Sequence, residues 1–318
     1  MLELIQHYID SLPYDRKPES LYEPIKYVLS LGGKRIRPML MLMSYALYKD
    51  DVESILPQAI GLETYHNYTL LHDDLMDNAD VRRGMPTVHC KWDANTAILS
   101  GDSMLVLAYQ RMQNCPADKL PAVLDVFTTT ALEIGEGQQY DMEFETRNDV
   151  REEEYIEMIR LKTSVLLACA MKIGAIMAEA PKEDVDNLYR FGERMGLAFQ
   201  LQDDFLDVYG DPKVFGKAIG GDITSNKKTY MLINAIGKAE GKDQETLMGW
   251  INAKDFDREE KVKAVTEIYT RLGIDTMAKA KMEEYYAEAL AALAEVSVPE
   301  EKKAQLREYA AKMMKREK

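Results

Sequence analysis

Two short stretches of the sequence carry carboxylates at a spacing that suits a divalent metal ion. The first, LLHDDLMD, contains Asp73, Asp74 and Asp77. Residues four apart share one face of a helix, so Asp73 and Asp77 would lie together with Asp74 about 100° round. Like charges at that spacing repel one another unless a positive charge lies between them, and a metal ion is the obvious candidate.

The second stretch, FQLQDDFLD, repeats this DDxxD spacing with Asp203, Asp204 and Asp207. A solvated acidic face is the alternative for either copy alone, but two copies together argue against it. Carboxylates without His or Cys partners select Mg²⁺ or Mn²⁺ over zinc. Mg²⁺ usually leaves coordination positions to water and substrate phosphates, so the pattern predicts a diphosphate held through metal ions.

Clusters of cations accompany the two carboxylate motifs in an otherwise acidic chain, and each has a simpler alternative. Lys34, Arg35 and Arg37 in GGKRIRP could instead cap a helix, and a lone His66 is more often a core or interface residue. Arg82 and Arg83 follow the first motif, where guanidinium forks suit phosphate oxygens, although surface arginines are common. Lys162 and Thr163 interrupt an otherwise apolar face of a helix expected around 159–167, where a snorkelling lysine is the alternative to a phosphate site. The last basic site is a glycine-rich stretch with Lys217, Asp222 and Lys227.

Composition limits the partners and the location. The 318 residues carry a formal charge of −14, which argues against nucleic acid or an anionic membrane surface as the main partner. Cys90, Cys115 and Cys169 share no CxxC spacing, so reduced thiols are expected. The N-terminus has no export signal and no apolar stretch is long enough to span a membrane, which predicts a cytoplasmic protein.

Helices must position these side chains. Proline is absent from 122–180 and 213–297, and apolar residues recur there at three and four rather than two. We expect an all-α fold of about ten or more helices in one domain, 1–318. Expected helices cover 21–31, with Pro24 in its first turn, 54–77, 93–112 and 117–141.

A diphosphate leaving group would leave a carbocation, which needs a dry apolar pocket. The helix before Asp73 and the methionine-lined helix around Met104 and Leu107 could form such a pocket.

Over nearly its whole length the chain resembles the short-chain trans-isoprenyl diphosphate synthases, the family of farnesyl and geranylgeranyl diphosphate synthases. The resemblance rests on elements that occur in order: GGKRIRP, DDLMD followed by two arginines, Lys162 with Thr163, FQLQDDFLD, then Lys217 and Lys227. It implies the all-α isoprenoid synthase type I fold, a single-domain helical bundle around a central cavity, and a homodimer. It also implies head-to-tail (1'-4) condensation of isopentenyl diphosphate with an allylic diphosphate, namely dimethylallyl, geranyl or farnesyl diphosphate.

The same resemblance implies roles for individual residues. Three Mg²⁺ ions would be ligated by Asp73, Asp77 and Asp203, with Asp74, Asp204 and Asp207 in support. The allylic diphosphate would be held by Arg82, Lys162 and Lys217 with the assistance of Lys227, while Thr163 and Gln200 would steady the developing cation. The isopentenyl diphosphate would be held by Lys34, Arg37, His66 and Arg83. The departing diphosphate would remove the proton.

The resemblance is less specific about the length of the product. In this family the residues four and five positions before the first motif form the floor of the pocket that holds the growing prenyl chain. Here they are Thr69 and Tyr68, about 6 to 7.5 Å along the helix from Asp73. One aromatic and one small residue favour C15 to C20 products, although the chain lacks the two extra residues of the bacterial farnesyl motif.

Two other functions stay open on the sequence alone. A class I terpene cyclase also has a first DDxxD helix, but its second motif normally contains Asn, Ser or Thr and Glu. A non-catalytic helical subunit of a synthase should have lost metal ligands or cations, and none of the expected ones is missing.

Overall fold

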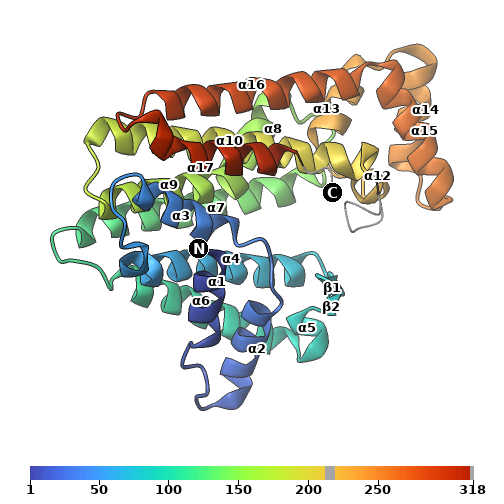
Figure 1. Ribbon diagram of the computed structural model, residues 1–318. Helices are drawn as coiled ribbons and strands as arrows, with labels where there is room; N and C mark the ends of the chain where they lie inside the picture. The colour runs from blue at the N-terminus through green and yellow to red at the C-terminus, as the bar shows by residue number, and fades with distance from the viewer. Residues whose placement is uncertain (212–218, 316–318) are drawn as a thin grey trace. The chain divides into compact units, whose positions relative to one another are not determined.

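The computed structural model describes residues 1–211 and 219–315, and almost all of their regular structure is helical (Figure 1). The prediction of an all-α fold is confirmed. Within the described ranges the strands are limited to one two-stranded hairpin. No helix in those ranges is both long and apolar enough to span a membrane.

The chain forms two compact units, the first comprising Met1–Thr128 with Cys169–Val185 and the second Thr129–Ala168 with Asp186–Lys318. Three long helices each contribute residues to both units: α7 (Leu120–Phe144), α9 (Val165–Met177) and α10 (Lys182–Tyr209). The organisation as one domain over 1–318 stays a prediction.

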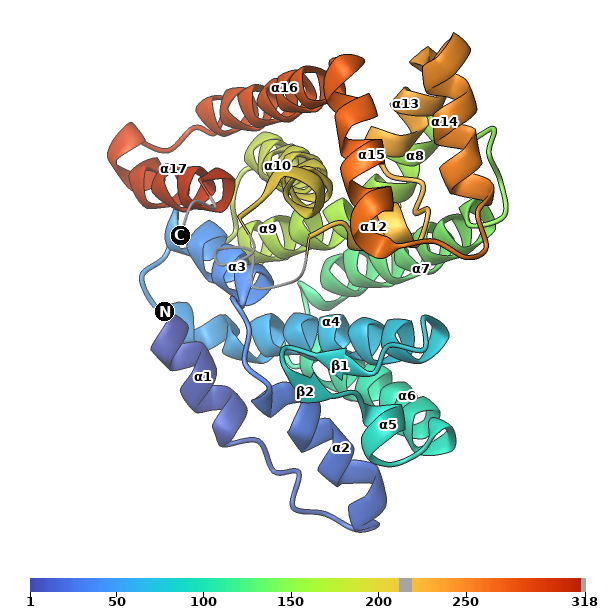
Figure 2. The ribbon, with the colours of Figure 1, turned by 90° about the vertical axis from the view of Figure 1, so that its right-hand side faces the viewer.

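The first unit is built around α4 and α6, which pack side by side (Figures 1 and 2). α4 packs against α1 and α3, while α2 and α5 pack against α6. Besides the long helices that contribute to both units, this unit contains, in chain order, α1 (Leu2–Asp10), α2 (Glu19–Ser30), α3 (Ile36–Ala46), the 3-10 turn η1 (Val52–Ile55), α4 (Leu56–Met76), β1 (Val81–Arg82), β2 (Met85–Pro86), α5 (Val88–Lys91) and α6 (Ala94–Met112).

The second unit has a core of large side chains, including Phe144, Tyr155, Leu201 and Tyr269, each at most 2% exposed. α15 packs against α13, α14 and α16, and α17 packs against α16. The further elements of this unit are α8 (Glu152–Ile159), η2 (Arg160–Ser164), α12 (Gly221–Thr224), α13 (Tyr230–Lys238), α14 (Gly241–Asn252), α15 (Arg258–Arg271), α16 (Ile274–Ala294) and α17 (Glu300–Met314).

Sequence reasoning located most helices to within a few residues, with two local errors. The helix expected over 21–31 begins at Glu19, so Pro24 lies in its second turn rather than its first. The segment around Lys162 was expected to continue a regular helix, but η2 is a π-helical turn. Such turns add one residue to the helical repeat and are frequent at functional sites.

Candidate active site

The first carboxylate motif ends α4. The helix stops because Asn78 adopts a left-handed conformation, with φ of 52°, directly after Asp77. Carboxylates at the C-terminal end of a helix face the negative end of its dipole, so Asp73, Asp74 and Asp77 need a compensating cation. The same holds for the second motif, which lies in the last two turns of α10.

Arg82 supplies part of this compensation in the first motif. Its Nε donates to Oδ2 of Asp74 at 2.7 Å, and its Nη2 lies 3.9 Å from Oδ2 of Asp73. Burial raises the pKa of the Asp74 carboxyl, and the hydrogen bond from Arg82 opposes that shift. The Arg82 guanidinium therefore offsets part of the negative charge of Asp73 and Asp74.

Arg82 and Arg83 are adjacent in sequence, but a tight hairpin turn places them against different partners. Val81 pairs with Pro86 and Arg82 with Met85, which leaves Arg83 and Gly84 as the two-residue turn. Both turn residues have positive φ, 54° and 76°, as a type I′ hairpin turn requires. Arg82 thus turns to Asp74, whereas Arg83 donates from Nη1 to the carbonyl oxygen of Gly32.

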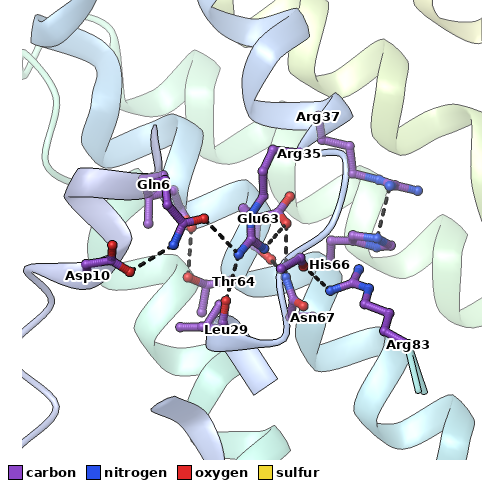
Figure 3. Close-up of polar contacts among 12 residues, drawn as sticks. Gln6, Asp10, Leu29, Arg35, Arg37, Glu63, Thr64, His66, Asn67 and Arg83 are labelled. Atoms are coloured by element: carbon purple, nitrogen blue, oxygen red, sulfur yellow. Dashed lines mark hydrogen bonds and ion pairs between the residues drawn. The ribbon is translucent and has the colours of Figure 1, made fainter. Parts of the chain in front are cut away.

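The structure brings together three of the four residues predicted to hold isopentenyl diphosphate. Arg37 Nη1 and His66 Nε2 are 3.0 Å apart (Figure 3). The Arg83 guanidinium covers Gly33, where an added Cβ would lie 2.9 Å from its Cζ. Lys34, the fourth residue, is exposed on the same turn of the chain. We call Lys34, Arg37, His66 and Arg83 the cation seat.

Electrostatics keep His66 neutral in the cation seat. Burial and then the charges of Arg37 and Arg83 hold the pKa of the His66 imidazole well below its usual range. A neutral imidazole can accept a hydrogen bond from Arg37 through Nε2. Burial lowers the pKa of Arg37 to about 10, so its guanidinium stays protonated at neutral pH. The seat can therefore offer positive charge without repulsion from the ring.

In the second unit, the carboxylates of the second motif have different environments. Asp204 is 4% exposed; it accepts hydrogen bonds from the Tyr155 hydroxyl and, at 3.1 Å, from Gln200 Nε2. Burial raises the pKa of the Asp204 carboxyl to about 7. Asp207 Oδ2 accepts from the backbone N–H of Asp222 at 2.9 Å, whereas Asp203 is half-buried.

The π-turn η2 presents Lys162 and Thr163 to partners on α7 and α10. Lys162 Nζ is 2.6 Å from Oδ2 of Asp141, and Thr163 Oγ1 donates to Gln200 Oε1 at 3.2 Å. Burial alone would raise the pKa of the Asp141 carboxyl, but the charges of Lys227 and Lys162 outweigh it and hold the pKa below its usual range. Asp141 therefore interacts with two lysines that were predicted to bind diphosphate, with Lys162 through an ion pair and with Lys227 through its charge.

The metal-binding prediction can be compared with the donor set. Among residues 1–211 and 219–315, no group of three or more His, Cys, Asp or Glu side chains is arranged to hold a metal ion by itself. The aspartates of both motifs offer carboxylate oxygens, and Asp77 is exposed. Hard oxygen donors in small numbers suit Mg²⁺, which completes its shell with water and substrate phosphate.

The residues predicted to line the product pocket lie on α4 and α6. The Tyr68 ring contacts those of Tyr65 and His72, with centroids 5.5 and 4.8 Å apart. Met104 is completely buried. Leu107 instead lines a cavity of about 510 Å³ near the end of α6, together with polar residues such as Gln110.

One predicted residue, Lys217, lies outside the described residues. Sequence reasoning missed Asp141, Tyr155 and Glu63, each of which contacts a predicted site residue or a neighbour of one. Asp141 stands four residues after Gly137 in a stretch, GQQYD, whose polar residues interrupt an apolar helix. That interruption was the one signal available for it.

Comparison with known proteins identifies the family of this chain. The sequence model of the polyprenyl synthetase family matches residues 18–269. The chain belongs to the polyprenyl synthetase family. It is 42% identical over 256 residues to a short chain isoprenyl diphosphate synthase of Methanocaldococcus jannaschii, covering 80% of this chain and 78% of the relative. It is 41% identical over 262 residues to a geranylgeranyl diphosphate synthase of Methanosarcina mazei, covering 81% and 80%.

Solved structures agree with the fold. A crystal structure of a geranylgeranyl pyrophosphate synthase matches with a TM-score of 0.93 and 42% identity, covering 100% of this chain and 97% of that one. A geranylgeranyl pyrophosphate synthase from Corynebacterium glutamicum, complexed with isoprenyl diphosphate and magnesium, matches with a TM-score of 0.87 and 28% identity, covering 99% and 97%. These findings confirm the predicted family, the isoprenoid synthase fold and a prenyltransferase of the short-chain type.

Proposed function

We propose that the chain condenses isopentenyl diphosphate head-to-tail (1'-4) with an allylic diphosphate and releases an all-trans prenyl diphosphate of C15 to C20. One observation carries the proposal: Arg82 and Arg83 are adjacent in sequence but face two different sites. Arg82 bonds to a carboxylate of the first motif, whereas Arg83 bonds to the GGKRIRP turn beside Arg37 and His66. Two cationic sites suit two diphosphate substrates, and a terpene cyclase needs only one.

The chemistry assigns a role to each group. The Mg²⁺ ions, when bound to the carboxylates of both motifs, would stabilise the charge that builds on the allylic diphosphate as its carbon–oxygen bond breaks. Lys162, Lys217 and Arg82 would hold the oxygens that the metal ions leave uncovered. Metal ligation by Asp73, Asp77 and Asp203, three ions per site and Mn²⁺ as a substitute are parts of this proposal.

Thr163 and Gln200 would steady the carbocation with their oxygen atoms. Their hydrogen bond at 3.2 Å, and the one from Gln200 to Asp204 at 3.1 Å, fix the orientation of the Gln200 amide. C4 of isopentenyl diphosphate then bonds to C1 of the allylic cation. The new cation loses a proton from C2 to the departed diphosphate, which leaves the double bond of the longer product.

Product length would be limited by Tyr68. Its ring is fixed between His72 and Tyr65, and Tyr65 in turn packs on Phe127 with ring centroids 5.3 Å apart. A side chain packed on two sides cannot easily swing away from a growing chain, which favours C15 to C20. A geranylfarnesyl diphosphate synthase of Natronomonas pharaonis is also 39% identical over 251 residues, covering 73% of each chain, so the length must be measured.

We further propose a homodimer formed through α6. The helix exposes Ile98, Leu99 and Val106 with fractional exposures of 43%, 59% and 60%. Large apolar side chains in such a row are typical of an interface, and a twofold dimer would pair the face with its own copy. A cytoplasmic location stays a prediction.

Turnover by the purified chain tests the proposal. With Mg²⁺, isopentenyl diphosphate and geranyl or farnesyl diphosphate, we expect prenyl diphosphates of C15 to C20 by chromatography. A hydrocarbon formed from farnesyl diphosphate alone would favour the cyclase. No product from the chain alone would favour a non-catalytic subunit, and products of C30 or longer would overturn the proposed length.

A further inference from the structure

A buried ion pair lies directly behind the cation seat. Arg35 Nη1 donates to Oε1 of Glu63 at 2.8 Å, and the two side chains are 0% and 3% exposed (Figure 3). Arg35 Nη2 also donates to the carbonyl oxygen of Leu29 at 2.6 Å. Asn67, one residue after His66, donates to Oε1 of Glu63 at 3.2 Å. Arg35 thus has a different environment from its neighbours Lys34 and Arg37.

The ion pair holds the chain in a conformation that it would otherwise avoid. Arg35 has φ of 50°, in the left-handed region, and caps the start of α3. A non-glycine residue is strained in that region and persists there only where its surroundings fix it. The side chain of Arg35 is fixed at both ends of its guanidinium, to Glu63 on α4 and to Leu29 at the end of α2.

The turn fixed in this way carries the cation seat. Lys34 precedes Arg35, and Arg37 lies in the first turn of α3 immediately after it. Arg83 holds the same turn from its other side, through the carbonyl oxygen of Gly32. Any shift of Arg35 must therefore move the residues on both sides of it.

Glu63 also offsets the charge of the seat. Its carboxylate favours the protonated forms of both Arg37 and Arg83, which otherwise repel one another and have pKa values lowered first by burial. One buried carboxylate therefore supports three guanidiniums before a diphosphate arrives.

We propose that Glu63, through its ion pair with Arg35, is a positioning residue for isopentenyl diphosphate. The inference rests on the proposed function of the cation seat, and it adds a residue that need not touch the substrate. Loss of the Glu63 charge should weaken this substrate and leave the allylic one unaffected.

The variant Glu63→Gln keeps the shape of the side chain and removes its charge. We expect the Kd for isopentenyl diphosphate, by calorimetry, and its KM to rise about tenfold or more, the loss typical of a buried charged contact. The KM for the allylic substrate should stay within about twofold. Asp184→Asn is the matched control, because Asp184 is a buried carboxylate of the same unit, 2% exposed and bonded to Tyr48 at 2.7 Å. Both KM values should be unchanged in it.

A second variant covers the case in which Glu63→Gln fails to fold. Arg35→Met combined with Glu63→Leu replaces the pair by apolar side chains, which buried sites often tolerate. We expect a folded protein with a raised Kd for isopentenyl diphosphate, because the turn has lost both contacts of the Arg35 guanidinium, to Glu63 and to Leu29.

The outcomes separate this inference from the proposed function. If the folded double variant binds isopentenyl diphosphate as the wild type does, or if Glu63→Gln raises both KM values alike, the positioning role is wrong. A wild type that binds isopentenyl diphosphate without turnover overturns the proposed function, while a selective loss of binding in Glu63→Gln would still support this inference. A wild type that does not bind isopentenyl diphosphate overturns the inference as well.

Discussion

Gly137 lets α7 approach the π-turn that carries Lys162 and Thr163. A Cβ at Gly137 would lie 2.8 Å from the Cα of Lys162 and from the carbonyl carbon of Leu161, and closer still to the backbone nitrogen of Lys162. Ordinary contact begins at 3.4 Å, so Gly137→Ala must move these backbone atoms by at least 0.6 Å, the difference between 3.4 and 2.8 Å. Backbone atoms cannot rotate away, so Lys162 and Thr163 would shift with them.

A shift of this size should reduce the rate rather than prevent folding. Misplacement of a reacting group by about 1 Å can cost roughly 100-fold, so we expect kcat to fall about 10-fold to 100-fold. Overpacking costs about 1–3 kcal/mol of stability, which the better helix propensity of alanine offsets by about 1 kcal/mol. Steady-state kinetics with both substrates saturating, together with thermal unfolding, measure the two effects.

Gly135→Ala is the matched control in the same helix. An added Cβ there has no atom within 4 Å, so kcat should be unchanged and stability should rise by about 1 kcal/mol. If folded Gly137→Ala has a kcat within about threefold of the wild type, the close approach does not position Lys162 and Thr163 and the reasoning fails.

Three further predictions concern product length, pH and assembly. Tyr68→Ala removes seven heavy atoms from the pocket floor, more than the five carbons of one prenyl unit, so chromatography should show products longer by about one unit; an unchanged product would exclude Tyr68 as the floor. Because the pKa of His66 is held well below its usual value of about 6.5, the unfolded chain takes up a proton below that pH that the folded chain does not. The free energy of unfolding should fall by up to about 1.3 kcal/mol between pH 7.5 and 5.5 from this source, and urea unfolding of His66→Gln should lack that fall. Val106→Glu places a charge on the exposed α6 face and should shift a dimer toward monomer in light scattering, whereas an unaltered dimer would place the interface elsewhere.

Much of the fold and of the site was predictable from local pattern. Helical periodicity located α6 to within one residue of its start, where the structure shows that Asp93 caps the helix by accepting from the N–H of Thr96 at 2.8 Å. Spacing predicted that the carboxylates of each motif share a helix, and the order of motifs indicated the family. These features depend on residues within a few positions of one another.

The partners of individual cations could not be predicted because they depend on distant parts of the chain. Arg35 and Arg37 look equivalent in GGKRIRP, but Arg35 meets Glu63, 28 residues away, and becomes a buried structural residue. Arg82 and Arg83 are likewise adjacent, and only the hairpin turn shows which one faces Asp74. Residue type gave the charge of each group, and three-dimensional packing decided its role.

Lys162 illustrates the same limit. Its sequence context predicted a cation on an apolar helix face, but the π-turn and the ion pair with Asp141, 21 residues earlier, had no signature at short range. Close packing of Gly137 against this turn is visible only in the structure.

The central claim is that both carboxylate motifs hold one allylic diphosphate through divalent ions while isopentenyl diphosphate occupies a separate cationic site. The most direct measurement is calorimetric binding of each substrate alone, with and without Mg²⁺, to the wild type and to Asp73→Asn and Asp203→Asn. We predict that either substitution abolishes the Mg²⁺-dependent part of allylic diphosphate binding and leaves isopentenyl diphosphate binding within about twofold. Undiminished Mg²⁺-dependent binding of the allylic substrate in either variant would contradict the account.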